Sequence, residues 1–357
     1  MCGSWQVTSC SPQESLVLSP GTWQTAGLIM LTSPITDQRA WTAASIDAPR
    51  CWYYPLPDVC FKAFEQAKQD LVQAPRPLTA FCLPEVVRTE CANALEAVRA
   101  ALETGRGFAI IEGGGPAGES LAGPDAMLLY WIVGQAIGRP VVQNVQGTLL
   151  YDVRDTGQDV AQGARFSVTN YESSFHTDNS FGTEVLDYVG LLCLQTAKAG
   201  GRSQVLSGFA LHNELLAHHR GALARLYQSF HIDRRGGIRE GEQPTIAFPI
   251  MQWDGRELLL RYLRYWIQAG HEKAGQPLTV AQMTALDVLD QVLRRQDLRV
   301  EFDLKPGQMY FINNRWILHN RTAFEDYPEL AGRRHLVRFW LRRREDAPQG
   351  EPAPCSP

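Results

Sequence analysis

The segment Pro306–Phe324, PGQMYFINNRWILHNRTAF, is the stretch from which the fold can be worked out. Its first part, GQMYFINN, is an apolar run between a glycine and two asparagines, a pattern typical of a short β-strand. His319 follows shortly after this run. The segment therefore predicts a strand that leads into a chemically active side chain.

Further short runs of this kind lie on both sides of that segment. They are apolar or alternating in character, and Gly, Pro or Asn residues bound them. Their number increases beyond residue 165. We expect strands at 107–113, 140–145, 149–155, 189–197, 201–208, 299–304 and 335–343.

Helical patterns precede and interrupt these strands. They cover 58–74, 84–105, 126–138, 208–219 and 279–295. Thr279 is the expected N-cap of the last helix. The segment 261–272, RYLRYWIQAGHE, fits either a lid or an ordinary helix, and we favour the helix. Many short strands without regular strand–helix alternation predict an α+β protein, with an antiparallel barrel or sandwich as its core and helices flanking it.

The composition excludes several classes of protein. The 357 residues include 34 Lys+Arg and 38 Asp+Glu, for a net charge of −4, and 45% are hydrophobic. Such a chain is neither a basic nucleic-acid binder nor a disordered regulator. The eight cysteines form no Cys-x-x-Cys pair, so we expect reduced thiols. Without an export signal or a membrane-spanning run, we expect a cytoplasmic protein with no membrane partner.

The strongest chemical signal is SSFHTDNSF, residues 173–181, which contains His176 and Asp178. Side chains alternate with period two along a strand, so His-x-Asp places both groups on one face. An imidazole nitrogen and a carboxylate oxygen can then reach one metal ion. A second histidine would complete the two-His-one-carboxylate triad that binds Fe(II). His319 is the candidate for that second histidine.

Two arginines follow His319 in RRHLVRFWLRR, at Arg334 and Arg338. Their spacing of four places both guanidinium groups on one face of a strand. Two inward-facing arginines near a metal fit two carboxylates, one from a co-substrate and one from the substrate. The alternative for such arginines is a solvated strand edge, and we accept it for Arg342, Arg343 and Arg344.

These motifs resemble the taurine dioxygenase-like branch of the Fe(II)/2-oxoglutarate-dependent oxygenases, the TauD/TfdA and clavaminate synthase-like enzymes. The resemblance covers about residues 105–345. It rests on four blocks in the family's order and spacing: FHTDNSF, AKAGGRSQVLSG, NNRWILHNRTAFED and RRHLVRFWL. It implies a double-stranded β-helix, or jelly-roll, core.

The resemblance also implies roles for individual residues. His176, Asp178 and His319 match the iron ligands, and Arg334 matches the arginine that binds the distal carboxylate of 2-oxoglutarate. Ser203 stands where the family usually has a threonine that binds the same carboxylate. Arg338 matches an arginine that holds an anionic group of the substrate in some members; support of the 2-oxoglutarate site is an equal alternative. Pocket residues near the metal motif are expected to be Asn170, Glu172 and Phe181, with ordinary packing or capping as the alternative.

The implied activity is oxidation of a C–H bond by Fe(II), 2-oxoglutarate and O₂, with release of succinate and CO₂. We expect a small, carboxylate-bearing substrate, an amino acid or a natural-product intermediate, and hydroxylation as the outcome. Desaturation and oxidative cyclisation remain alternatives. From a different class, a non-catalytic metal- and 2-oxoglutarate-binding protein would have lost a ligand or Arg334, and neither is missing. A cupin-type isomerase or hydrolase would have no 2-oxoglutarate for Arg334 to hold. Glu172 stands in a stretch that borders the pocket, so taurine itself is not implied.

The metal motif also sets the expected domain organisation. Residues 1–55 form an irregular leader, 56–345 a single catalytic domain, and 346–357 a disordered tail. The count of one domain follows because Asp178 and His319, 141 positions apart, must meet in one barrel. The sequence leaves the formation of a homo-oligomer open.

Overall fold

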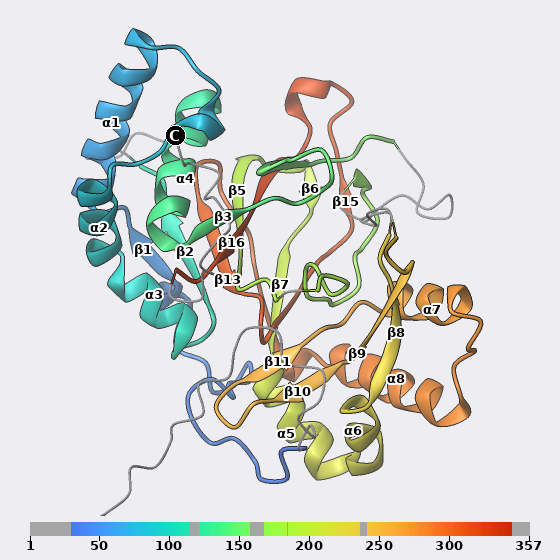
Figure 1. The fold of residues 1–357 in the computed structure, drawn as a ribbon. Coiled ribbons are helices and arrows are strands. Elements are labelled where there is room, and N and C mark those ends of the chain that lie inside the picture. Colours follow the sequence, from blue (N-terminus) through green and yellow to red (C-terminus); the bar gives the residue numbers. More distant parts are fainter. Residues whose placement is uncertain (1–29, 115–120, 158–167, 184, 236–240, 345–357) are drawn as a thin grey trace, which may run out of the picture.

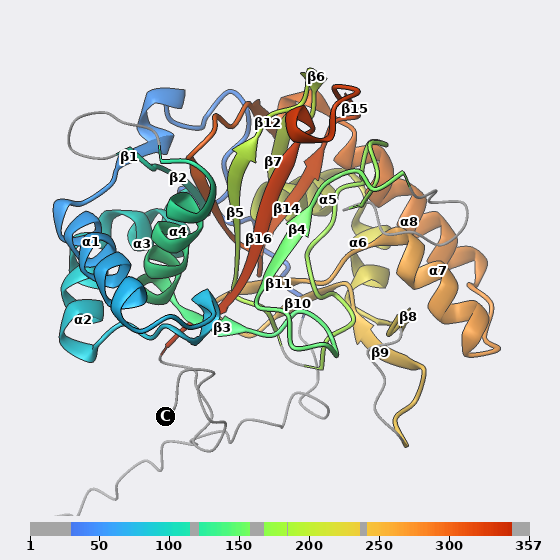
Figure 2. The same ribbon diagram turned by 90° about the horizontal axis from the view of Figure 1, so that it is seen from above.

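The structure is a computed structural model that describes residues 30–114, 121–157, 168–183, 185–235 and 241–344. The predicted tail, 346–357, and residues 1–29 of the predicted leader lie outside the described residues. Strands occupy the centre of the molecule, and two groups of helices lie on opposite sides of them (Figures 1 and 2). The predicted mixture of helices around a strand-rich core is therefore confirmed.

The predicted strand after Gly307 is β13 (Met309–Asn313), and it lies in the middle of the main sheet. Among the described residues this sheet has seven strands in the order β1-β2-β13-β5-β16-β3, and β4 also pairs with β16. Only β1 and β2 run parallel. The other strands of the sheet are β1 (Tyr53–Pro55), β2 (Phe108–Glu112), β3 (Arg139–Val141), β4 (Leu150–Val153), β5 (Tyr188–Gln195) and β16 (His335–Arg342).

A smaller sheet carries the histidine that the sequence singled out. It has the order β12-β7-β14, formed by β12 (Arg299–Phe302), β7 (Ser203–Ser207) and β14 (Ile317–Arg321). In its antiparallel register Val205 lies opposite His319 and Ser203 lies opposite Arg321. Ser203 and His319 therefore point to the same face of this sheet.

Three strand pairs complete the β-structure of the described chain. They are β8 (Ser229–Asp233) with β9 (Thr245–Pro249), β10 (Met251–Trp253) with β11 (Leu258–Leu260), and β6 (Ala199–Gly200) with β15 (Phe324–Glu325). The turn between β10 and β11 reaches the end of the main sheet through Glu257, which forms ion pairs with Arg315 and Arg343.

The helices form two groups along the chain. The group beside the main sheet consists of α1 (Asp58–Gln73), α2 (Glu85–Ala94), α3 (Glu96–Glu103) and α4 (Gly123–Ile137). The group on the other side consists of α5 (Gly208–His218), α6 (Arg220–Leu226), α7 (Arg264–Lys273) and α8 (Val280–Leu293). Thr279 caps α8 as predicted, since its hydroxyl accepts from the N–H of Gln282 at 3.2 Å. The segment 261–272 is largely the helix α7, as we favoured.

The single helix predicted across 84–105 is wrong, because the chain bends at Leu95 between α2 and α3. Leu95 has φ −93° and ψ 12°, and only 2% of its surface is exposed. Cys91, Leu95 and Val98 all enter one apolar core, at the four- and three-residue spacing of a single helix face. The apolar pattern therefore continues through Leu95 and does not reveal the break.

The end of the predicted leader contains structure that the sequence did not reveal. Tyr53–Pro55 form β1, which pairs in parallel with β2. Trp41 and Trp52 are buried, and the Trp41 indole N–H donates to the carbonyl of Arg106 at 2.7 Å. These residues extend the core even though their sequence has weak periodicity.

Two apolar cores lie on the two faces of the main sheet, and β16 contributes to both. Val337, Phe339 and Leu341 pack with α4 in one core. Leu336 and Trp340 face the other core, which lies between the main sheet and the smaller one. Because side chains alternate along a strand, Arg338 shares the inward face with Leu336 and Trp340.

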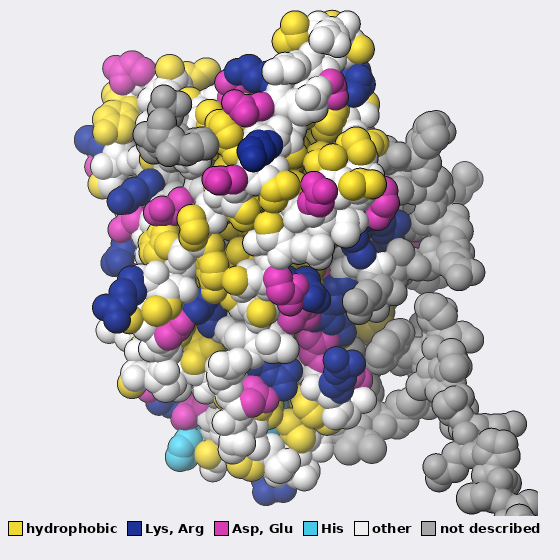
Figure 3. Space-filling model, turned by 90° about the vertical axis from the view of Figure 1, so that its left-hand side faces the viewer, with side chains coloured by type: hydrophobic (Ala, Val, Ile, Leu, Met, Phe, Trp, Pro, Cys, Tyr) yellow, Lys and Arg dark blue, Asp and Glu magenta, His cyan; other side chains and the backbone are white. Residues whose placement is uncertain are grey.

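The surface over the N-terminal helices carries charges of both signs (Figure 3). Basic and acidic groups are interspersed there, and they include the exposed ion pairs Lys68–Asp125 and Arg99–Glu96. The described cysteines, Cys51, Cys60, Cys82, Cys91 and Cys193, are free thiols, as predicted. None of the described helices combines the length and apolar character that crossing a bilayer requires.

Packing of α4 on the sheet leads to a test of the fold. A Cβ atom on Gly134 would lie 2.1 Å from the ring of Phe339, which is fully buried and stacked on Trp131. We expect Gly134→Ala to lower the free energy of unfolding by about 1–3 kcal/mol, because the ring has no space to move. Urea unfolding followed by circular dichroism measures this change.

The matched control is Gly221→Ala in α6, where a Cβ atom would meet nothing within 4 Å. Alanine is the better helix former, so this change should raise the free energy of unfolding by about 0.5 kcal/mol. Equal effects of the two substitutions would contradict the packing of α4 described here.

Candidate metal centre

Backbone pairing brings two distant histidines together. The segment Ser173–His176 runs antiparallel to β14: the N–H of Ser173 donates to the carbonyl of Arg321, and the N–H of His176 donates to that of His319, both at 3.1 Å. The N–H of His319 donates back to the carbonyl of His176 at 3.0 Å. The two imidazole rings consequently lie side by side, with centroids 4.3 Å apart.

Asp178 completes the group that the sequence predicted. Its Oδ1 lies 3.5 Å from His176 Nε2 and 3.9 Å from His319 Nε2. In the part of the chain that the structure describes, these three residues form a group whose ligand atoms all lie within 4.8 Å of one another. Two imidazoles and one carboxylate on one side of an ion leave further coordination positions open, which fits Fe(II).

The protonation states of the three side chains also fit a metal. His176 Nδ1 lies 2.8 Å from the carbonyl of Ser174, so Nδ1 carries the proton and Nε2 presents its lone pair. Burial, together with the neighbouring His176, lowers the pKa of His319 to about 3, so this imidazole is neutral. Burial opposes ionisation of Asp178, but the nearby charge of Arg338 holds its pKa well below the usual range.

Two side chains of β16 contact Oδ2, the oxygen of Asp178 that faces away from the histidines. Trp340 Nε1 donates to Asp178 Oδ2 at 2.8 Å, and Arg338 Nη1 lies 3.1 Å from the same atom. Arg338 Nε donates to Gln143 Oε1 at 2.8 Å, and its guanidinium lies over the ring of Tyr151. Both donors act on Oδ2, so Oδ1 is the oxygen that faces the histidines.

The sequence did not predict these partners of Asp178. Trp340 could have been found, because it follows Arg338 by two positions on a strand and so shares its face. Gln143 and Tyr151 carry no comparable signal. Arg338 thus pairs with a carboxylate of this chain, Asp178. Its predicted role in substrate binding stays a prediction.

Arg334 lies directly before β16. It is 7% exposed, and its guanidinium lies over the ring of Phe324. A Cβ atom on Gly201 would come within 3.1 Å of Arg334 Nε, so the glycine leaves the space that the arginine occupies. Within the described residues no carboxylate forms an ion pair with this guanidinium. Burial, together with the nearby charge of Arg321, lowers the pKa of Arg334 to about 9.

Ser203 lies in β7 on the same face as His319 and is 7% exposed. The three predicted pocket residues lie near the metal ligands in the chain but differ in environment. Asn170 and Glu172 are exposed, and the Glu172 carboxylate lies 3.4 Å from Asn320 Nδ2. Phe181 is half-buried and packs against the core that lies between the main sheet and the smaller sheet. These positions agree with a pocket rim and equally with ordinary packing.

The fold and this donor set define the class of the protein: two histidines and one carboxylate inside a strand-rich core are the metal site of non-haem iron oxygenases. Comparison with known proteins agrees. The profile of the family described as "Taurine catabolism dioxygenase TauD, TfdA family" matches residues 74–340. The chain therefore belongs to the TauD/TfdA family. It is a dioxygenase that uses iron and 2-oxoglutarate.

Similar proteins include FR-33289 synthase of Streptomyces rubellomurinus (strain ATCC 31215), which is 28% identical over 87% of this chain and 91% of its own length. The taurine hydroxylase-like protein SAT17 of Stachybotrys chartarum (strain CBS 109288 / IBT 7711) is 30% identical over 46% of this chain and 41% of its own.

Among solved structures, asparagine oxygenase with Fe(II), 2S,3S-3-hydroxyasparagine and succinate has a TM-score of 0.59 at 19% identity. It aligns with 81% of this chain and 93% of its own. The oxygenase OrfP with Fe and alpha-ketoglutaric acid has a TM-score of 0.56 at 18% identity over the same shares. These likenesses show a shared fold.

The hydrogen bond from Trp340 to Asp178 leads to a test. We expect Trp340→Phe to weaken Fe(II) binding about 10-fold, because Oδ2 loses a donor and the carboxylate gains freedom to turn. Trp316→Phe is the matched control, since Trp316 is equally buried but its Nε1 has no hydrogen-bond partner among the described residues. Titration of the metal-free protein with Fe(II) without oxygen measures both affinities. Equal weakening in the two variants would refute the role of the Trp340 donor.

Proposed function

We propose that this protein hydroxylates a C–H bond of a small, carboxylate-bearing substrate, an amino acid or a natural-product intermediate. One observation carries the proposal: besides the His176–Asp178–His319 group, the chain buries the guanidinium of Arg334, which has no carboxylate partner among the described residues. When bound, iron, 2-oxoglutarate and O₂ supply the oxidant, and succinate and CO₂ are released. The chain's own task is to hold these groups and to place one C–H bond beside them.

In this proposal His176, Asp178 and His319 hold the metal, and Arg334 holds the distal carboxylate of 2-oxoglutarate. A buried guanidinium without a partner is costly, and a carboxylate provides two acceptors that match its planar fork. Binding of that anion would also restore the pKa of Arg334, which burial lowers to about 9. Ser203, on the face of β7 that His319 shares, supplies a hydroxyl for the same carboxylate.

The substrate would bind at the open side of the metal, near Arg338, Asn170, Glu172 and Phe181. Arg338 already neutralises Asp178 through Nη1 and donates from Nε to Gln143, which would leave the N–H groups of Nη2 for an anionic group of the substrate. The proposed substrate class draws support from the similar proteins, since one solved structure holds a hydroxylated asparagine with succinate. Desaturation or oxidative cyclisation would use the same cofactors.

The proposal extends to the organisation of the molecule. The main sheet and the sheet β12-β7-β14 face one another across the apolar core between them. They would be the two halves of a double-stranded β-helix. Residues 56–345 would form one catalytic domain in the cytoplasm, with a small molecule as its partner and without a role in binding nucleic acid or membranes.

The triad is tested by removing one ligand. We expect His176→Ala to abolish succinate release, because the metal keeps only two protein ligands. Anaerobic addition of Fe(II) and 2-oxoglutarate to the wild-type protein should produce a visible charge-transfer absorption, which the variant should lack. His218→Ala, at an exposed histidine at the end of α5, is the control and should retain both signals. Succinate release by His176→Ala at the wild-type rate would exclude the proposed triad.

The role of Arg334 is tested by titration with 2-oxoglutarate. We expect Arg334→Gln to raise the Kd of 2-oxoglutarate by about 100-fold while Fe(II) affinity changes less than threefold, because a charge-assisted pair worth roughly 3 kcal/mol is lost. Arg333→Gln is the control, since the Arg333 guanidinium donates to the carbonyls of Tyr327 and Pro328. An unchanged Kd in Arg334→Gln would contradict the assignment.

The substrate class is tested by screening amino acids and other carboxylates. A substrate is expected to accelerate succinate formation and to gain one oxygen atom, which mass spectrometry detects. A product that has instead lost two hydrogen atoms would favour desaturation or cyclisation.

A further inference from the structure

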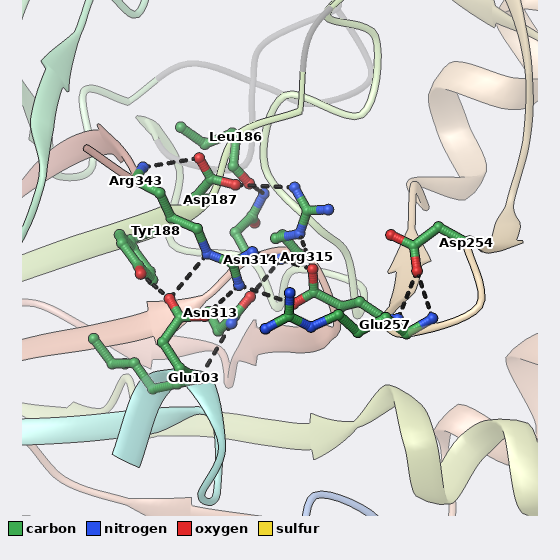
Figure 4. Close-up of polar contacts among 12 residues, drawn as sticks. Glu103, Leu186, Asp187, Tyr188, Asp254, Glu257, Asn313, Asn314, Arg315 and Arg343 are labelled. Atoms are coloured by element: carbon green, nitrogen blue, oxygen red, sulfur yellow. Dashed lines mark hydrogen bonds and ion pairs between the residues drawn. The ribbon is translucent and has the colours of Figure 1, made fainter. Parts of the chain in front are cut away.

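The side chain of Asn314 is bonded to the main chain of the predicted metal ligand Asp178. Asn314 lies in the turn between β13 and β14 and is 3% exposed. Its Oδ1 accepts from the N–H of Asp178 at 2.8 Å, and its Nδ2 donates to the carbonyl of Asp178 at 3.0 Å. The same Nδ2 donates to the carbonyl of Leu186 at 3.2 Å (Figure 4).

We propose that Asn314 is a positioning residue that fixes Asp178 for metal binding. The inference rests on the proposed metal site but assigns a role to a residue outside it. A side chain that bonds both the N–H and the carbonyl of one residue supplies the hydrogen bonds that a neighbouring strand would supply. These bonds satisfy two buried backbone groups and fix the direction of the chain. The carboxylate extends from that fixed point.

The backbone around Asp178 needs such a contact. On one side Thr177 is tied to the end of β11, since its N–H donates to the carbonyl of Tyr262 at 2.9 Å. On the other side Asn179 has φ 53°, in the left-handed region that non-glycine residues adopt rarely. Asp178 lies between Thr177 and Asn179, and Asn314 bonds both the N–H and the carbonyl of Asp178.

The turn that carries Asn314 is held by a main-chain hydrogen bond of Asn314 and by ion pairs around the neighbouring Arg315 (Figure 4). Its N–H donates to the carbonyl of Asp187 at 2.7 Å. The next residue, Arg315, forms ion pairs with Asp187 at 3.0 Å and with Glu257 at 2.7 Å. Arg343 joins from the end of β16, 2.8 Å from Glu257. The turn that carries Asn314 is thus tied to β5, to the β10–β11 turn and to β16.

The test compares Asn314→Ala with Asn313→Ala. Asn313 is the neighbouring buried asparagine, and its Nδ2 donates to the carbonyl of Leu102 at 3.1 Å rather than to Asp178. Both variants lose buried hydrogen bonds, so both should lower Tm. Only Asn314→Ala should weaken Co(II) binding to the metal-free full chain, by about 10- to 100-fold, and alter the visible absorption of bound Co(II).

A second variant, Asn314→Asp, keeps the side-chain size and the acceptor for the Asp178 N–H. It loses both donated bonds and places a carboxylate against the Asp178 carbonyl, so Co(II) affinity should fall below that of the wild type. This variant decides the question if the alanine variant does not fold.

The outcomes separate this inference from the metal site on which it rests. If the wild-type protein does not bind Co(II), the metal site is wrong. If it binds Co(II), but the Asn314 variants bind with wild-type affinity or Asn313→Ala weakens binding equally, Asn314 has no positioning role.

Discussion

The buried carboxylate of Asp178 is the feature on which the rest of the site depends. An ionised carboxylate inside an apolar core is unfavourable unless donors and cations surround it. Here Trp340 and Arg338 contact Oδ2, and the two imidazoles lie near Oδ1. A metal cation between the imidazoles and Oδ1 would complete the neutralisation. The strands β14 and β16 must therefore both approach the segment that carries Asp178.

A charge of the opposite kind is also buried. Arg334 is as buried as Asp178, at 7% exposure, but no carboxylate pairs with it in the described chain. If 2-oxoglutarate binds as proposed, its distal carboxylate would supply that partner. The cost of burying an unpaired guanidinium would then be a physical reason for the co-substrate that the family uses.

The grouping of His176, Asp178 and His319 could be predicted from the sequence because local spacing carries the signal. His-x-Asp, a histidine after an apolar strand and two arginines four apart are visible in short windows. Trp340 and Asn314 were missed because their partner, Asp178, is 162 and 136 positions away, and periodicity identifies a face but not what lies opposite it. The break between α2 and α3 at Leu95 was missed because the apolar pattern of one helix face continues through it.

The three proposed metal ligands are positioned by two different kinds of interaction. His319 belongs to a strand and His176 pairs with that strand, so backbone hydrogen bonds fix both histidines. Asp178 has no strand neighbour, and side chains must hold it: Asn314 at the main chain and Trp340 with Arg338 at the carboxylate. Backbone pairing tolerates most substitutions, whereas a side-chain contact depends on residue identity. The geometry of the carboxylate ligand is therefore the part of this site that single substitutions outside the metal ligands can change.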